Sequence, residues 1–458
     1  MQGTLEKFFH LKENGTDVRT EILAGITTFM TMAYILAVNP SILGTTGMDS
    51  GAVFTASALG ACVGTLIMAF SSNYPFVLAP GMGLNAFFAY TVCGQMGYSW
   101  KVALAAVFVE GLLFLIMSLT SIREAIFNCI PNCLKIGVSA GIGLFIAFIG
   151  LQSSKLVVDG ATLVTMYPFK ASLADGTIHS TGMGAILCIA GVLITGWLMH
   201  KNVPGNILWG ILATWILGMI LEFAGIYIPN PKLGMYSTLP NFSNGISIPS
   251  LAPTFMQMDF SVVASFNFIT IMLAFMFVDL FDTLGTLMGV AAKADMLDED
   301  GKLPRIKGAL LADSIATATG AVLGTSTVTT FVESSAGVGV GGRTGLTGVV
   351  SAALFGLSLF LSPIFLAIPA FATAPALIIV GFLMLSGITK INFNDLTEAL
   401  PAYMTIIAMP FAYSISEGIA WGIISYVVMN KLAPVKGRKV NVLLYILAII
   451  FILKYVMV

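Results

Sequence analysis

Long apolar segments with few charges recur along the whole chain, and this feature restricts its fold more than any other. A helix needs about 20 mainly apolar residues to cross a bilayer. Only 9% of the 458 residues are charged, where a soluble globular protein has about a quarter. These values exclude a soluble enzyme and predict an all-α polytopic membrane protein with about 14 transmembrane segments. The predicted spans are 21–38, 52–70, 76–93, 101–119, 134–152, 182–199, 206–224, 261–290, 308–323, 326–340, 346–362, 374–389, 401–430 and 440–457.

The rest of the composition narrows the choice of partners. Lys and Arg number 21 and Asp and Glu 22, so the net charge of −1 gives no electrostatic footprint for nucleic acid. Five cysteines in so long a chain do not form a disulfide framework. The three histidines (His10, His179 and His200) have no accompanying set of ligands, and we therefore expect no metal and no cofactor.

Residues 1–20 form a charged leader. They lack the basic start, apolar core and small-residue cleavage site of a secretory signal, so we expect the leader to be retained. Lys and Arg predominate in alternate loops, for example at Lys201 and Lys390, which predicts a cytoplasmic N-terminus. The basic cluster at 431–439 fits this orientation only if 401–430 is a hairpin, and both readings remain open.

Two of the predicted spans look like broken helices. Pro80, Gly81 and Gly83 interrupt the segment 76–93, and the segment 326–340 is rich in Thr and Ser before it runs into glycines. Paired hydrophobic segments that are broken at matching positions indicate the binding site of a transporter, because unwound backbone can meet a substrate there.

A faint internal repeat supports this pairing. The segment 32–39 resembles 273–280, and 54–66 resembles 310–322 at a similar offset, with Ser57 opposite Asp313. Each broken segment is then the third span of a seven-span half. Because seven is odd, the two halves would have opposite topology, which predicts inverted repeats. Chance similarity between apolar helices is the alternative explanation.

Four acidic residues inside predicted spans give a sharper signal. Asp279 and Asp282 lie three residues apart on one helical face, Glu333 lies in the second broken segment, and Asp313 lies in the span before it. A charged side chain costs a few kcal/mol at mid-bilayer and persists where it faces a cavity or a partner. A single acid can also be an interfacial group, but several acids on adjacent segments favour a functional site.

The first broken segment has the side chains to hold a planar polar ligand. Gly83 permits close approach of the backbone. Asn85 offers both a donor and an acceptor to the edge of a heterocycle, and Phe87 or Phe88 can stack on its face. Helix packing for the glycine and lipid contact for the rings are the alternative uses.

Four motifs together resemble a known family. They are LKENGTDVRTEILAGITTFMTMAYILAVNPSIL, APGMGLNAFF, FVDLFDTLGTLMGVA and GTSTVTTFVESSAGVGVGGRTGLT. They resemble the AzgA-type purine (guanine/hypoxanthine) permeases of the nucleobase/cation symporter-2 family, and the resemblance covers nearly the whole chain. It implies a uracil-permease-like fold of two inverted seven-span repeats, with short strands in spans 3 and 10.

The resemblance also implies a division into a core domain and a gate domain. The cytoplasmic leader would occupy 1–20. The two halves of the core domain would be 21–120 and 261–363, and those of the gate domain 121–260 and 364–458. An elevator-type movement of the core domain and a homodimer formed through the gate domain are implied with it.

The family pattern assigns roles to individual residues. Gly83, Asn85 and Phe87 would belong to the span-3 part of the substrate site, Asp279 and Asp282 to span 8, and Glu333 to span 10. Asp313 would support the core and take part in proton coupling together with Asp279 and Glu333. Carboxylates accept hydrogen bonds, which suits the N1–H of guanine or hypoxanthine, whereas neutral adenine has no N1–H. The resemblance thus implies purine import by proton symport, with guanine and hypoxanthine favoured.

Several alternatives stay open. Within the class they are an adenine permease or a uracil or xanthine permease, and sodium remains a possible coupling ion because carboxylates are hard oxygen ligands. A sulfate-type anion transporter is more distant, because acids in the site would repel an anion. An intramembrane aspartyl protease needs its aspartates in YD and GxGD contexts, which the chain lacks.

Overall fold

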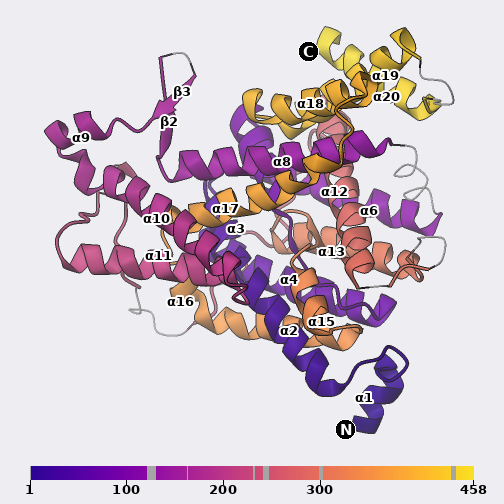
Figure 1. The fold of residues 1–458 in the computed structure, drawn as a ribbon, viewed down its shortest axis with the longest axis horizontal. Coiled ribbons are helices and arrows are strands. Elements are labelled where there is room, and N and C mark those ends of the chain that lie inside the picture. Colours follow the sequence, from indigo (N-terminus) through magenta and orange to yellow (C-terminus); the bar gives the residue numbers. More distant parts are fainter. Residues whose placement is uncertain are drawn as a thin grey trace.

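The computed structural model describes residues 2–120, 130–161, 163–230, 233–240, 247–294, 296–298, 303–434 and 440–457. Figure 1 shows a chain built almost entirely of helices, with the N-terminus and the C-terminus on opposite sides of the molecule. The α-helices are α1 (Gln2–Phe9), α2 (Val18–Met32), α3 (Ile35–Gly44), α4 (Ser50–Ser72), α5 (Met82–Ala86), α6 (Trp100–Leu119), α8 (Asn132–Ser153), α9 (Phe169–Asp175), α10 (Thr181–His200), α11 (Asn206–Phe223), α12 (Phe266–Lys293), α13 (Ile306–Leu323), α14 (Ser334–Val340), α15 (Gly345–Ser358), α16 (Ser362–Phe365), α17 (Ala370–Leu385), α18 (Leu396–Phe411), α19 (Ile415–Leu432) and α20 (Val442–Met457).

Shorter elements complete the chain. Strands β1 (Leu78–Pro80) and β4 (Val328–Thr330) pair with each other, and β2 (Val157–Asp159) pairs with β3 (Val164–Met166). A π-helix, η1, spans Phe87–Gln95, and the 3-10 helices are η2 (Thr177–His179), η4 (Leu359–Leu361) and η5 (Ser386–Lys390).

Within the described ranges, ten helices are long and apolar enough to cross a membrane. The fold is therefore that of a helical polytopic membrane protein. The predicted spans 76–93 and 326–340 are not continuous helices, because each contains a strand followed by short helical pieces. The stretch 401–430 divides into α18 and α19, which pack together, while residues 435–439 of the basic cluster lie outside the described residues. The count of fourteen spans and the inverted repeats remain predictions.

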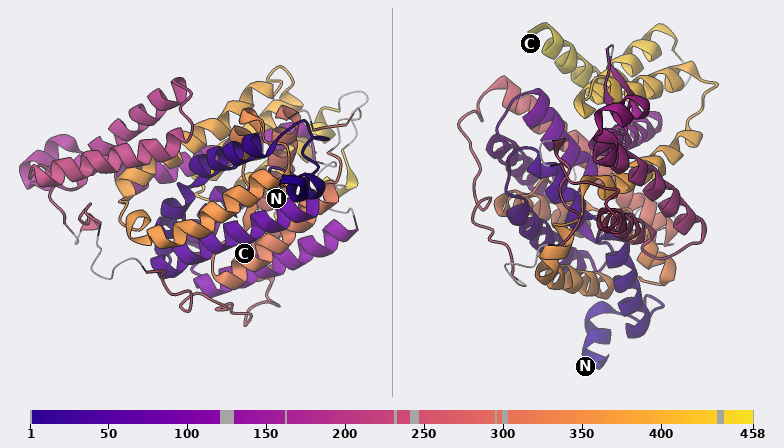
Figure 2. Two further views of the ribbon diagram at one scale, coloured as in Figure 1. Left: turned by 90° about the horizontal axis from the view of Figure 1, so that it is seen from below. Right: turned by 90° about the vertical axis from the view of Figure 1, so that its left-hand side faces the viewer.

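The helices pack in two groups. In one group, α4 lies against α13 and α15, α6 lies against α13, and α2 lies against α14 and α15. In the other, α8 packs on α17 and α18, and α10 packs on α11 and α17. Figure 1 places α2, α4 and α15 in its lower part and α8, α17 and α18 above them, and the views in Figure 2 show the same chain from two further sides. We call these sets the lower group and the upper group.

Small residues permit the closest approaches between helices. A Cβ on Gly381 of α17 would lie 2.3 Å from the carbonyl oxygen of Gly143 on α8. A Cβ on Gly111 of α6 would lie 2.7 Å from the backbone nitrogen of Ala318 on α13. Helices in a bilayer associate through such close packing, because lipid tails are as apolar as the side chains and give no hydrophobic driving force.

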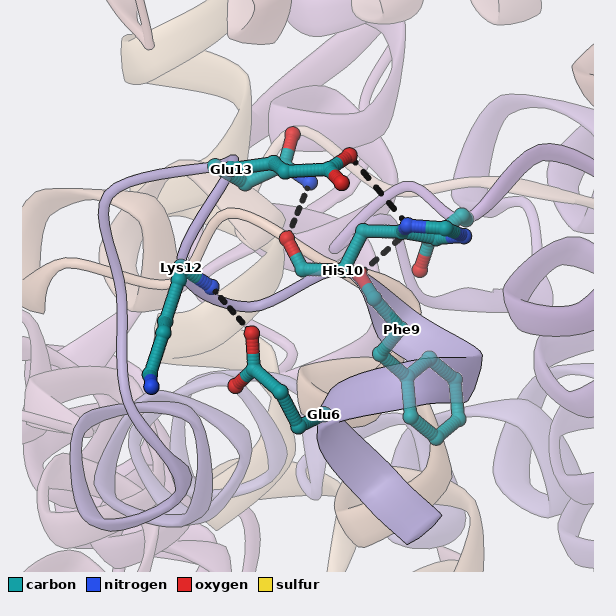
Figure 3. A network of polar contacts seen from close by, with 7 residues as sticks. Glu6, Phe9, His10, Lys12 and Glu13 are labelled. Atoms are coloured by element: carbon teal, nitrogen blue, oxygen red, sulfur yellow. Dashed lines mark hydrogen bonds and ion pairs between the residues drawn. The ribbon is translucent and has the colours of Figure 1, made fainter. Parts of the chain in front are cut away.

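The leader packs on the lower group. Its turn is held by the backbone N–H of Lys12, which donates to Glu6 at 3.0 Å, and by the His10–Glu13 pair at 3.2 Å (Figure 3). The Asn73 side chain donates to the Phe9 carbonyl at 2.9 Å and thereby fastens the leader to the end of α4. Tertiary contacts thus order a segment whose charge pattern indicated only a polar leader.

Helix α2 begins with two acidic residues of different function. Asp17 is its N-cap, and the backbone N–H of Thr20 holds the pKa of this carboxyl below its usual value. Glu21 is fully buried and accepts bonds from the backbone N–H of Arg343 at 2.7 Å and of Thr347 at 3.0 Å. Its carboxylate therefore caps the start of α15 and ties the two halves of the chain together.

Candidate functional site

The two broken segments meet as a pair of antiparallel strands. Leu78 lies opposite Thr330, and Pro80 lies opposite Val328. The backbone N–H of Gly81 donates to the Thr327 carbonyl at 3.0 Å, just beyond the end of the register. All six strand residues are buried. Backbone groups at membrane depth need internal partners, and the pairing supplies them to chain that is not helical.

Pro80 and Gly81 explain why the first segment stops being a strand there. Proline has no N–H to continue a ladder, so it is tolerated at a strand end. Gly81 then begins α5, and a Cβ at this position would lie 2.8 Å from the Thr329 methyl group. The close approach of the two segments therefore depends on a residue without a side chain.

Two carboxylates are half-buried beside this junction. Asp282 comes from α12, and its Oδ2 atom lies 3.4 Å from the position that a Cβ on Gly81 would take. Glu333 is the N-cap of α14, three residues after the end of β4, and its Oε1 atom accepts a hydrogen bond of 2.7 Å from the Tyr34 hydroxyl. We call Asp282 and Glu333 the accessible pair. They can accept hydrogen bonds from N–H groups of a ligand.

Two further carboxylates are fully buried behind the strand. Asp279 and Asp313 are joined through the Thr283 hydroxyl, which lies 2.9 Å from Asp279 Oδ1 and 3.1 Å from both oxygens of Asp313. The Thr329 hydroxyl of β4 lies 2.6 Å from that of Thr283 and donates to Asp313 at 3.1 Å. We call Asp279 and Asp313 the buried pair. Asp279 and Asp282, three residues apart, thus differ in exposure.

The predicted residues of the first segment also lie at the junction. Asn85 is fully buried, donates to the Pro80 carbonyl at 3.5 Å and accepts from the Ser326 hydroxyl. Phe87 is fully buried and packs edge-on against Phe275 of α12, with 4.7 Å between ring centroids.

Gly83 of α5 packs against α8 of the upper group. A Cβ on Gly83 would be 2.7 Å from the Cγ2 atom of Ile142 on α8. The structure thus brings Gly83, Asn85, Phe87, Asp279, Asp282, Asp313 and Glu333 around one strand pair.

Sequence reasoning did not find several polar partners of the site. Tyr34, Thr283 and Thr329 carry hydroxyls that bond to its carboxylates, but threonine and tyrosine are too common in spans to stand out. From the sequence alone, Glu110 of α6 can be explained as a single interfacial acid. It is instead fully buried and accepts a bond from Thr327 at 3.2 Å. Its place in the middle of an apolar helix was the available signal.

No metal centre accompanies this site within the described part of the chain. Groups of three or more His, Cys, Asp or Glu side chains placed to hold a metal ion do not occur among those residues. The carboxylates, hydroxyls and single amide of the site can donate and accept hydrogen bonds.

Comparison with known proteins fits this architecture. The family model Xan_ur_permease, described as Permease family, matches residues 19–421. The adenine permease AdeP of Escherichia coli (strain K12) is 43% identical and covers 99% of this chain and 96% of its own. The guanine/hypoxanthine permease PbuO of Bacillus subtilis (strain 168) is also 43% identical and covers 97% of this chain and 99% of its own.

A solved structure shares the fold at low sequence identity. The transmembrane domain of a cyanobacterium bicarbonate transporter, BicA, superposes with a TM-score of 0.64 at 15% identity and covers 87% of this chain and 97% of its own. Membrane-length helices around a strand-interrupted polar centre, together with these similarities, define the class as a membrane permease and not an enzyme. The chain belongs to the Xan_ur_permease family of permeases.

Proposed function

We propose that this permease imports purine nucleobases, with guanine and hypoxanthine favoured, by proton symport. The observation that carries the proposal is the accessible pair, two half-buried carboxylates on two different elements beside the strand junction. Two carboxylate acceptors complement a ligand edge that presents N–H donors, as guanine and hypoxanthine do. Relatives of equal identity are named for adenine and for guanine/hypoxanthine, so the relatives support purines as the substrate class.

The proposed site combines acceptors and apolar surface. Asp282 and Glu333 would accept hydrogen bonds from the nucleobase. Gly83, Asn85 and Phe87 would form the opposite wall of the site, and Asp279 would lie beneath it. Adenine would require a protonated acid at the same place, because its N1 is an acceptor. Adenine, uracil and xanthine are the alternatives within the family, and competition experiments separate them.

An anion is a poorer substrate for this site. The BicA similarity shows the fold alone at 15% identity. An anion would meet the carboxylates of the accessible pair. Arg343 is the cation nearest in sequence to Glu333. Its guanidinium donates to the carbonyls of Val338 and Gly342, both at 2.8 Å, and so caps the end of α14.

The buried pair suits proton coupling. A threonine hydroxyl can donate to an ionised carboxylate or accept from a protonated one. The Thr283 hydroxyl, within 3.1 Å of Asp279 and Asp313, can therefore keep the network bonded whether the pair holds one proton more or fewer. Burying a charge is costly, and a proton removes that cost before the substrate docks. Asp279 or Glu333 would be the acid that titrates, with Asp313 supporting it, and sodium is the alternative ion.

The transport step would move one helix group past the other. The lower group contains helices of the proposed core domain (21–120 and 261–363), and the upper group contains those of the gate domain (121–260 and 364–458). Contact between the groups includes the Gly83–Ile142 approach and a second glycine contact, in which a Cβ on Gly205 would lie 3.1 Å from Met30. At each of these contacts one partner is a glycine and contributes no side chain, which would favour sliding. We extend the proposal to a cell-membrane protein with a cytoplasmic N-terminus that forms a homodimer through the gate domain.

The first test is uptake of labelled guanine and hypoxanthine into proteoliposomes that are alkaline inside and free of sodium. We expect accumulation that collapses with a protonophore and is inhibited by unlabelled purines more strongly than by uracil. If accumulation requires a sodium gradient, the assignment of the proton as coupling ion is wrong. If only uracil accumulates, the assignment of a purine as substrate is wrong.

A substitution in the buried pair tests the coupling. Asp279→Asn is expected to abolish accumulation, because an amide cannot exchange the proton. Normal accumulation by this variant would remove Asp279 from coupling. Thr55→Val is the control, since Thr55 is a buried hydroxyl that bonds only outside this network, to the Pro249 carbonyl at 2.9 Å, and we expect normal accumulation from it.

A further inference from the structure

Tyr34 lies where the first helix of the lower group is interrupted. Helix α2 ends at Met32 and α3 begins at Ile35, so Tyr34 falls between them. Its ring is fully buried, and its hydroxyl donates to Glu333 Oε1 at 2.7 Å. The two residues are 299 positions apart in the sequence. The bond therefore joins the first half of the chain to the accessible pair in the second half.

Close packing sets the distance that this bond spans. Helix α14, which Glu333 starts, lies against α2, and a Cβ on Gly337 would be 2.1 Å from the Thr28 hydroxyl and 2.7 Å from the Ala24 carbonyl. Gly337 is one helical turn after Glu333. The far end of α14 is held by the Arg343 guanidinium on the Val338 carbonyl. Because both the middle and the end of α14 are fixed, its first residue meets Tyr34 at a defined place.

We propose that Tyr34 is a positioning residue for Glu333. Its hydroxyl engages Oε1 and fixes the rotamer of the carboxylate, so that Oε2 is the oxygen that accepts the N–H donor of the ligand. Glu333 then offers the substrate one oriented acceptor and not a freely rotating carboxylate. This inference rests on the proposed function, because the ligand it concerns is the nucleobase of the same site.

Three properties of the contact support this role. Carboxylate hydrogen bonds are stronger than neutral ones and hold the side chain more firmly. The tyrosine ring is anchored by burial and has only two χ angles to order, so little entropy opposes the bond. Glu333 itself is half-buried, which leaves it within reach of a ligand while Tyr34 is not. In this proposal, Tyr34 orients the carboxylate and Glu333 contacts the ligand.

The first test is Tyr34→Phe, which deletes the hydroxyl and keeps the ring. Loss of one hydrogen bond to a charged group corresponds to about a tenfold change in affinity. We expect KM for guanine or hypoxanthine to rise about tenfold while Vmax stays within about twofold of wild type. Tyr227→Phe is the matched control, since Tyr227 is also buried and donates one bond, to the Tyr236 carbonyl at 2.9 Å in the upper group. Its KM should not change.

A charge-preserving cycle shows whether Tyr34 acts through Glu333. Glu333→Asp withdraws the carboxylate by one methylene and breaks the bond to Tyr34 without removing the charge. Adding Tyr34→Phe to this variant should then change KM by less than about twofold, because the interaction is already lost. Effects that multiply in the double variant would overturn the positioning role. Size-exclusion profiles confirm that each variant is folded.

The outcomes of the two proposals are distinguishable. A wild-type protein that takes up purine, combined with an unchanged KM in Tyr34→Phe, overturns the role of Tyr34 and leaves the proposed function intact. If wild type instead transports another nucleobase, KM is compared for that substrate. The comparison then tests the positioning role of Tyr34 independently of the purine assignment. A wild-type protein that binds no nucleobase overturns both.

Discussion

The two broken segments have the same outline but present different side chains. In the first, β1 leads into α5 and η1, and Asn85 is fully buried with its amide bonded to Pro80 and Ser326. In the second, β4 leads into α14, and Glu333 is half-buried and held from one side by Tyr34. The polar group of the first segment is bonded on both sides within the junction, whereas that of the second is the acceptor that we propose for the ligand. Equal backbone interruptions therefore need not imply equal roles.

The largest effect of a single substitution is expected at Glu333, the polar group of the second broken segment. Glu333→Gln removes the charge from the second segment, and we expect binding of guanine or hypoxanthine to weaken by about tenfold to a hundredfold and accumulation to cease. Equilibrium binding and proteoliposome uptake measure the two effects. Thr319→Val, which removes the hydroxyl of a half-buried residue bonded to the Ile315 carbonyl of its own helix, serves as control. Uptake at the wild-type rate would remove Glu333 from the site.

A smaller effect on binding and a larger one on stability are expected from the first segment. Asn85→Ala leaves the Pro80 carbonyl and the Ser326 hydroxyl without their partner, which costs about 1–3 kcal/mol for a buried polar group. The apparent melting temperature in detergent should fall, and KM should rise by a smaller factor than in Glu333→Gln. Ser326→Ala tests the same contact from the other side. A variant with unchanged melting temperature and a KM as high as that of Glu333→Gln would make the two segments equivalent.

The mildest change concerns the boundary between the helix groups. Gly83→Ala places a methyl group against Ile142, at 2.7 Å in the present arrangement, so either side must shift. We expect a severalfold lower Vmax, because the methyl group hinders movement at this contact, and a rise in KM that is smaller than in Glu333→Gln, because Gly83 also belongs to the wall of the proposed site. Ile142→Ala combined with Gly83→Ala should restore Vmax, because it removes the clashing methyl. Failure of the second change to restore it would place the effect of Gly83 elsewhere.

The sequence predicted the class and the main acids because both rest on local signals. Apolar length identified a helical polytopic membrane protein, and Asp279, Asp282, Asp313 and Glu333 stood out because charges are rare at membrane depth. Pro80 and the glycines beside it indicated the first interruption, and the structure has a strand there. The family resemblance is confirmed by the match over 19–421.

Other features could not be read from the chain. Asp279 and Asp282 look equivalent in sequence, yet one is fully buried beside Thr283 and the other is half-buried beside Gly81. Glu110 stands in the middle of an apolar helix, but its bond to Thr327, just before β4, is decided by tertiary packing. Exposure depends on which neighbours cover a side chain, and those neighbours come from distant parts of the sequence.

The sequence by itself determined that this protein lies in a membrane, that two of its spans are broken and that carboxylates accompany the breaks. Hydropathy, proline and charge influence structure within a few residues of where they occur, so their effects can be predicted from the sequence. The tertiary structure alone decided that the breaks pair as one antiparallel ladder, that Tyr34 reaches Glu333 across 299 residues, and that the four acids divide into an accessible pair and a buried pair. The ladder and the Tyr34–Glu333 bond depend on close approaches between distant segments, at Gly81 and at Gly337, and the exposure of each acid depends on which segments cover it.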